Sequence, residues 1–184
     1  MAEALLRERL AVRGIDATTA SVGFLFEGRE AEDGAIRAMA RRGIDLSAHR
    51  SRVLSEDLTE SATLILAMER AQVRRAAEEW PAVFDKAFTL PEFVGSARVV
   101  GPRRAGQDLA DWIRRIGASR GIDLYHRSAR SADIADPMGR SRRTFRACAD
   151  EIDALLEEFV DLAWPEAPPT DDHAVATPSS HGSS

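Results

Sequence analysis

The sequence is poor in cysteine and in lysine, and it lacks any long apolar run. Cys148 is the single cysteine among 184 residues, so the chain can form neither an internal disulfide nor a zinc site built from cysteines. No apolar stretch approaches the roughly 20 residues of a membrane-spanning helix. Residues 1–13 are charged throughout and do not resemble a secretory signal peptide. We therefore expect a cytoplasmic location and no membrane partner.

The charge balance argues against a nucleic-acid partner. The chain holds 25 basic and 30 acidic residues, a formal net charge of −5, whereas nucleic-acid-binding domains carry a basic surplus. A hydrophobic share of 44% and a charged share of 30% are typical of a globular protein, so we expect one domain at residues 1–163. Residues 164–184 are rich in proline, serine, threonine and aspartate without periodicity, which predicts a disordered tail.

Apolar periodicity and turn residues predict helices that alternate with strands. The run TLILAM at 63–68 is typical of a strand buried on both faces. Alternation of this kind requires crossover connections and therefore parallel pairing. The fold class expected is α/β, with a small doubly wound parallel sheet whose ligands sit at the carboxyl ends of the strands. Helices are predicted at 3–13, 32–42, 69–80, 105–116 and 140–163, and strands at 18–26, 63–68 and 86–90.

The stretch DIADPMGRS at 133–141 contains a candidate acid. Asp136, Pro137, Met138 and Gly139 fit the first to fourth positions of a type I turn. Read alone, the stretch is an ordinary surface turn. Proline restricts the residue before it to extended conformations, so the same stretch could also aim the Asp136 carboxyl at a site beside the sheet as a general acid.

A second stretch, GIDLSAHRSR at 43–52, allows two interpretations. It reads locally as the end of a helix followed by an exposed loop, which makes His49 an ordinary surface or structural histidine. The alternative places His49 in a hydrogen-bond network that supports a functional loop.

Taken together and in order, six stretches resemble the low-molecular-weight protein tyrosine phosphatases in their bacterial form. The resemblance covers about residues 1–162, and its strength comes from the order and spacing of the stretches. They are MAEALLR at 1–7, ASVGFLFEGR at 20–29, GIDLSAHRSR at 43–52, TLILAMER at 63–70, FTLPEF at 88–93, and DIADPMGRS at 133–141.

This resemblance implies a hydrolase of phosphate monoesters that acts on a phosphotyrosine protein or a small phosphate ester, without a metal or a cofactor. The family's loop between its first strand and first helix carries a nucleophilic cysteine followed five residues later by an arginine. An aspartate in a DP loop protonates the leaving group. By match, Asp136 is that acid, Phe26 and Met138 lie at the substrate rim, and Ser21 and His49 brace the phosphate loop.

The same resemblance implies that the central part of the site is absent. MAEALLR is similar to the start of the family's first helix, which follows the phosphate loop directly. The central first strand, the nucleophilic cysteine and the phosphate-binding arginine are therefore expected to be missing, leaving the neighbouring strands without a partner. Cys148 falls on the apolar stripe of the last predicted helix, with Asp153 and Ala154 where an arginine would be needed. We expect a buried structural thiol and an inactive chain.

Three explanations of this pattern remain open. In the first, the true start lies upstream of Met1. In the second, the chain is a non-catalytic phosphatase-like protein that binds a partner. In the third and weakest, it is an arsenate-reductase-like relative, although such enzymes need several cysteines and Cys148 alone cannot relay a disulfide. The sequence does not predict an oligomeric state.

Overall fold

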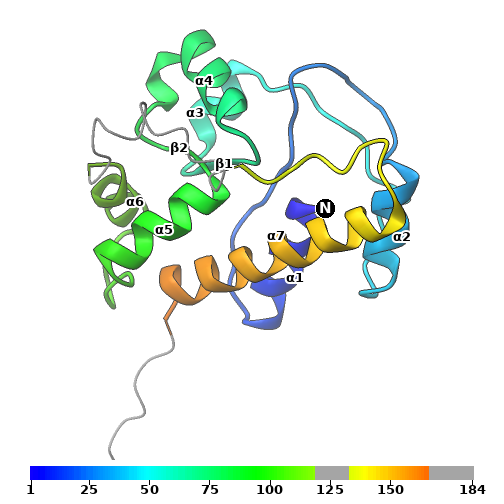
Figure 1. The fold of residues 1–184 in the computed structure, drawn as a ribbon. Helices are drawn as coiled ribbons and strands as arrows, with labels where there is room; N and C mark the ends of the chain where they lie inside the picture. The colour runs from blue at the N-terminus through cyan, green and yellow to red at the C-terminus, as the bar shows by residue number, and fades with distance from the viewer. Residues whose placement is uncertain (119–132, 166–184) are drawn as a thin grey trace, which may run out of the picture.

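The computed structural model describes residues 1–118 and 133–165, and Figure 1 shows two short strands surrounded by helices. None of the described helices is long and apolar enough to cross a membrane. In chain order the elements are α1 (Ala2–Val12), α2 (Asp33–Ala40), α3 (Glu56–Ser61), β1 (Ile65–Ala67), α4 (Arg70–Glu79), the 3-10 turn η1 (Pro81–Val83), β2 (Ala87–Thr89), α5 (Leu90–Val100), α6 (Leu109–Ala118) and α7 (Arg142–Ala163).

The two strands form a parallel pair, which confirms the predicted α/β class. Ile65, Leu66 and Ala67 of β1 stand opposite Ala87, Phe88 and Thr89 of β2. The connection between them runs through α4, which packs against both strands, and α5 packs against them as well. This is the crossover that parallel neighbours require.

The strand β1 is less buried than its composition predicts. Residues 64–68 are all only half-buried, whereas the three residues of β2 are fully buried. Within the described residues β1 pairs with β2 alone, so its second edge carries no neighbouring strand. The expectation that this run is buried on both faces is therefore wrong, because burial of a strand depends on what packs beside it as well as on its own side chains.

The predicted strand at 18–26 is also wrong. The structure has a single isolated parallel bridge there, between Gly23 and Val53, in place of a ladder. The Gly23 N–H donates to the Arg52 carbonyl and the Leu54 N–H donates to the Gly23 carbonyl, both at 2.8 Å. The residues are β-formers, but a strand needs a continuous partner, and this segment is paired at one residue only.

Helix ends follow the capping signals in the sequence. Ser55 and Ser141 each accept a hydrogen bond from a first-turn backbone N–H, at the starts of α3 and α7. Thr89 and Glu92 form a reciprocal capping box at the start of α5. The helix α5 is not among the helices that the apolar periodicity predicts, although its capping box is a local signal in the sequence. The helix predicted from residue 105 begins instead at Leu109.

The core is centred on α7, which packs against α1, α2 and α5 (Figure 1). On its apolar side, Phe159 contacts Phe93 edge to face at a ring-centroid distance of 5.5 Å. On its polar side, Asp153 binds Arg9 of α1 at 2.7 Å and Arg42, just after α2, at 3.0 Å. Burial and ion pairing therefore hold α1, α2 and α5 against α7.

The helix α7 ends at Ala163, one residue before the predicted start of the tail. Trp164 follows the helix directly, and its ring packs against Phe159 with centroids 5.9 Å apart. Residues 166–184, the rest of the predicted tail, lie outside the described residues.

Candidate functional site

The loop that carries Asp136 is fixed to the carboxyl end of β1. The Ile134 N–H donates to the Met68 carbonyl at 2.8 Å. Next to it, the Asp133 carboxylate accepts a hydrogen bond from the Arg70 backbone N–H at 2.9 Å, at the start of α4. Two segments far apart in sequence are thus joined at the strand end, where ligands of such sheets bind. We call residues 133–141 the acid loop.

The turn in the acid loop lies one residue later than predicted. The Arg140 N–H donates to the Pro137 carbonyl at 3.0 Å, so the bonded turn spans residues 137–140. Gly139, its third residue, has φ +70°, the left-handed conformation that a type II turn requires there. The Asp136 side chain accepts from the Met138 N–H at 2.9 Å and is exposed. The carboxyl is therefore oriented locally and open to solvent.

Ser21 and His49, the predicted bracing residues, meet at a residue that the sequence analysis did not single out. The Glu3 carboxylate accepts hydrogen bonds from both the backbone N–H and the hydroxyl of Ser21. It also pairs with Arg7 at 3.2 Å and lies 4.0 Å from the Nδ1 of His49. Glu3 gives no local signal of these contacts, because an acidic residue in a first helical turn is common.

A cavity of about 330 Å³ opens beside this cluster, at the N-terminal end of α1. Its wall combines Glu3, Ser21 and His49 with the loop at 45–52, including Asp45 and Arg52. The backbone and side chain of Ser47 donate to Asp45 and hold the pKa of that carboxyl below its usual range. Acidic, basic and neutral polar side chains therefore line the cavity.

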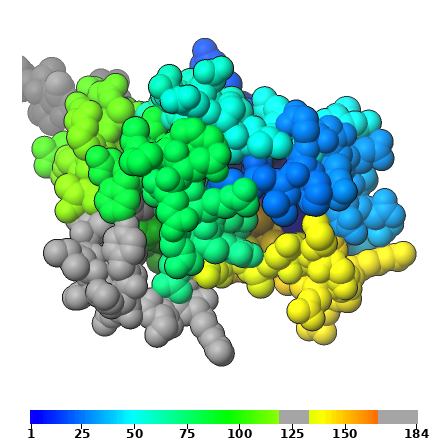
Figure 2. Space-filling view, turned by 90° about the horizontal axis from the view of Figure 1, so that it is seen from above, coloured from blue at the N-terminus to red at the C-terminus, as the bar shows by residue number. Residues whose placement is uncertain are grey.

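The two predicted rim residues lie on separate segments. Phe26 and Met138 have exposed fractions of 46% and 65%. The guanidinium of Arg29 stacks on the Phe26 ring, 3.6 Å from its centroid. Figure 2 shows the segment around residue 26 and the acid loop on the same face of the molecule. The two segments therefore border the same face of the molecule.

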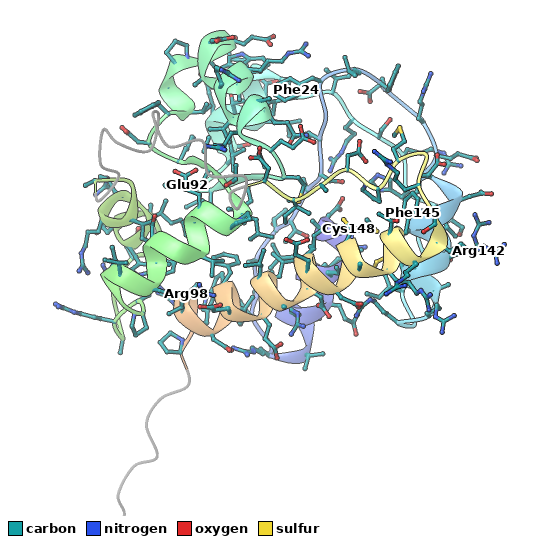
Figure 3. The ribbon with its side chains drawn as sticks, in the orientation of Figure 1. Phe24, Glu92, Arg98, Arg142, Phe145 and Cys148 are labelled. Carbon is teal, nitrogen blue, oxygen red and sulfur yellow. The ribbon has the colours of Figure 1, made fainter. Side chains whose placement is uncertain are left out.

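The only cysteine of the chain lies on the buried side of the last helix, α7. Cys148 has an exposed fraction of 7% and belongs to the main hydrophobic core. In Figure 3 it follows Phe145 along α7. Burial raises the pKa of the Cys148 thiol, and the nearby carboxylates of Glu151 and Asp136 raise it further. A nucleophilic cysteine needs the opposite environment, one that favours the thiolate.

Comparison with known proteins places these features in context. Residues 1–119 match the family described as low molecular weight phosphotyrosine protein phosphatase. A protein-arginine-phosphatase of Geobacillus stearothermophilus is 30% identical over 161 residues, which are 88% of this chain and 84% of the relative. A probable low molecular weight protein-tyrosine-phosphatase EpsP of Ralstonia solanacearum is 39% identical over 92 residues, covering 50% and 61% of the two chains.

Solved structures agree with the sequence matches. A crystal structure of a YwlE mutant from Bacillus subtilis superposes with a TM-score of 0.65 at 27% identity, covering 87% of this chain and 86% of the other. The low molecular weight protein tyrosine phosphatase from T. tengcongensis gives the same TM-score at 25% identity, with 87% of each chain covered. The acid loop, the parallel strand pair and these matches converge on one conclusion: the chain belongs to the low molecular weight phosphotyrosine protein phosphatase family.

Proposed function

We propose that these 184 residues contain the acid side of a phosphatase site and do not hydrolyse phosphate esters by themselves. The observation that carries the proposal is the environment of Cys148. It is the single thiol of the sequence, it is buried in the core, and its pKa is raised. A thiol in that environment is neither accessible to a phosphoryl group nor ionised enough to attack one.

Asp136 is the general acid in this proposal. Its carboxyl is exposed, is held by the Met138 N–H, and sits on a loop tied to the end of β1. A general acid protonates a leaving group only after a nucleophile has attacked, so Asp136 alone contributes nothing measurable. In a triad protease, loss of the nucleophile costs roughly a millionfold in rate, which sets the scale of the expected loss.

We expect the purified chain to show no enzymatic turnover of its own. Hydrolysis of 4-nitrophenyl phosphate, a phosphotyrosine peptide and phosphoarginine is expected to equal that of the Cys148→Ala and Asp136→Asn variants within error. The last two substrates match the tyrosine and arginine phosphatases that this chain resembles. Phosphate release is measured for all three proteins. A rate that falls in either variant would show that the chain has its own catalytic machinery and would overturn the proposal.

A binding role without catalysis is the second candidate, and the Phe26 segment favours it. Phe26 and its neighbour Leu25 have exposed fractions of 46% and 70%, beside an arginine stacked on the Phe26 ring. Adjacent apolar side chains exposed in this way are typical of an interaction surface.

A further inference from the structure

We propose that the exposed face at the start of α7 binds an acidic helix of another polypeptide. The face consists of Arg142, Arg143 and Arg146, and we call these three residues the α7 arginine face. The proposal uses neither Phe26 nor Cys148, so it can fail without affecting the proposed absence of catalysis, and the absence of catalysis can fail without affecting it.

Helix geometry places the three arginines on one surface. Arg142 and Arg146 are four residues apart, and Arg143 and Arg146 are three apart, spacings at which side chains on a helix are neighbours. All three are exposed, whereas Phe145 between them is buried against Gly34 of α2. Figure 3 shows Arg142 at the outer edge of the molecule, where α7 begins beside α2. The three side chains therefore form a single face that is open to solvent.

This face has no acidic partner within the part of the chain that the structure describes. None of its guanidinium groups lies within ion-pair distance of a carboxylate there. The nearest carboxylates along the chain are Asp136 and Asp150, and Asp150 is bound by Arg42 instead. Across residues 136–150 four arginines outnumber these two carboxylates, so the start of α7 keeps a positive excess with both of them counted.

The rest of α7 shows how such charges are balanced elsewhere in this fold. Carboxylates further along the helix each pair with an arginine of α1 or α5: Asp153 and Glu157 with Arg9, Glu158 with Arg98, and Asp161 with Arg13. Acidic side chains at helical spacing are thus a surface that arginines of this chain already bind. The α7 arginine face is the same kind of arrangement without its acidic counterpart.

The arginines do not serve the stability of α7 where they stand. The N-terminus of a helix carries a partial positive charge that repels cations, and α7 has no acidic residue in its first turn to offset them. Like charges three and four residues apart also repel one another. Residues that oppose local stability without compensation inside the fold are expected at functional surfaces, which favours a contact with a partner.

The size of the face favours a helix as that partner. The arginines span about one helical turn, roughly 5.4 Å, which glutamates three and four residues apart on a second helix match. Each guanidinium can bind a carboxylate through two parallel hydrogen bonds. A nucleic acid or an anionic membrane extends far beyond one turn and would meet the remainder of a chain whose net charge is −5.

Fluorescence anisotropy tests the proposal with a labelled, alanine-rich helical peptide that carries glutamates three and four residues apart. We expect saturable binding that weakens as salt is added. The triple variant Arg142→Ala, Arg143→Ala and Arg146→Ala is expected to weaken binding by at least about tenfold. The triple change from arginine to lysine at the same positions is expected to weaken it less, because lysine keeps the charge and loses the planar fork.

A matched triple variant separates this face from general charge effects. Arg74→Ala, Arg104→Ala and Arg115→Ala remove the same charge from exposed positions on α4, after α5 and on α6, and this variant is expected to bind the peptide like the parent chain. A glutamine version of the peptide is expected not to bind. The alanine variant of the α7 arginine face is expected to melt at or above the temperature of the parent chain, because cations repelled by the helix terminus have been removed.

Four results would each overturn the proposal. They are a failure of the acidic peptide to bind saturably, equal weakening by the matched variant, a lower melting temperature for the alanine variant of the α7 arginine face, and tighter binding of single-stranded DNA or anionic vesicles than of the peptide. The third result would mean that the arginines stabilise the fold, and the fourth that the face recognises an extended polyanion.

Discussion

Phe93→Ala is expected to lower the free energy of unfolding by about 3–5 kcal/mol. Phe93 of α5 is fully buried, and the rings of Phe88, Trp112 and Phe159 surround it edge to face at centroid distances of 5.1, 5.7 and 5.5 Å. Removing the ring leaves a cavity where β2, α5, α6 and α7 meet, because three aromatic neighbours cannot collapse into the space. Urea unfolding followed by circular dichroism measures the loss.

The matched control for this substitution lies on the same helix. Val99 is also on α5, but its exposed fraction is 85%, so Val99→Ala is expected to change stability by less than about 0.5 kcal/mol. Phe93→Leu keeps most of the volume and should cost less than the alanine variant. Similar losses for Val99→Ala and Phe93→Ala would mean that α5 does not pack as described.

Gly34→Ala is expected to destabilise the fold by about 2 kcal/mol although alanine is the better helix former. A Cβ at Gly34 on α2 would lie within 2.6 Å of three ring carbons of Phe145 on α7, and the ring is itself buried. The gain of about 1 kcal/mol in helix propensity is outweighed because α7 or the ring must move. For a chain of this size the loss lowers the melting temperature by roughly 4–8 °C.

A second glycine provides the control for helix propensity. Gly95 lies inside α5, and a Cβ there would meet no heavy atom within 4 Å beyond its chain neighbours and the backbone of its own helix. Gly95→Ala is therefore expected to raise stability by about 0.5–1 kcal/mol. Stabilisation by both alanines would contradict the close approach of α2 to α7.

Local signals in the sequence were enough to place most helices. The stripe from Phe145 to Phe159 on α7 and the Ser141 cap are both local, and the structure confirms the helix. The missed helix α5 was also available locally, since Thr89 and Glu92 form its capping box. The signal for α5 is therefore local, although the apolar periodicity does not predict this helix.

Sheet pairing and the contacts of Glu3 with Ser21 and His49 could not be predicted from local signals in the sequence. The pattern at 18–26 favours a strand, but Gly23 pairs only with Val53, and nothing local reveals how many partners a segment will find. Likewise, Glu3 contacts Ser21 and His49 only because the fold brings distant segments to the end of α1. The family resemblance supplied Ser21 and His49, whereas Glu3 required the structure.

The reactivity of Cys148 tests most directly whether these residues contain a nucleophile. Alkylation by iodoacetamide, followed by intact-mass spectrometry, measures the thiolate. Burial favours the neutral thiol, so we expect folded Cys148 to react at least about tenfold more slowly than the urea-unfolded chain, with an apparent pKa above the unfolded value. The raised pKa also predicts that stability falls as the pH rises above about 8.5, where the unfolded thiol ionises. Rapid labelling of the folded chain at neutral pH, with an apparent pKa below the unfolded value, would contradict the account.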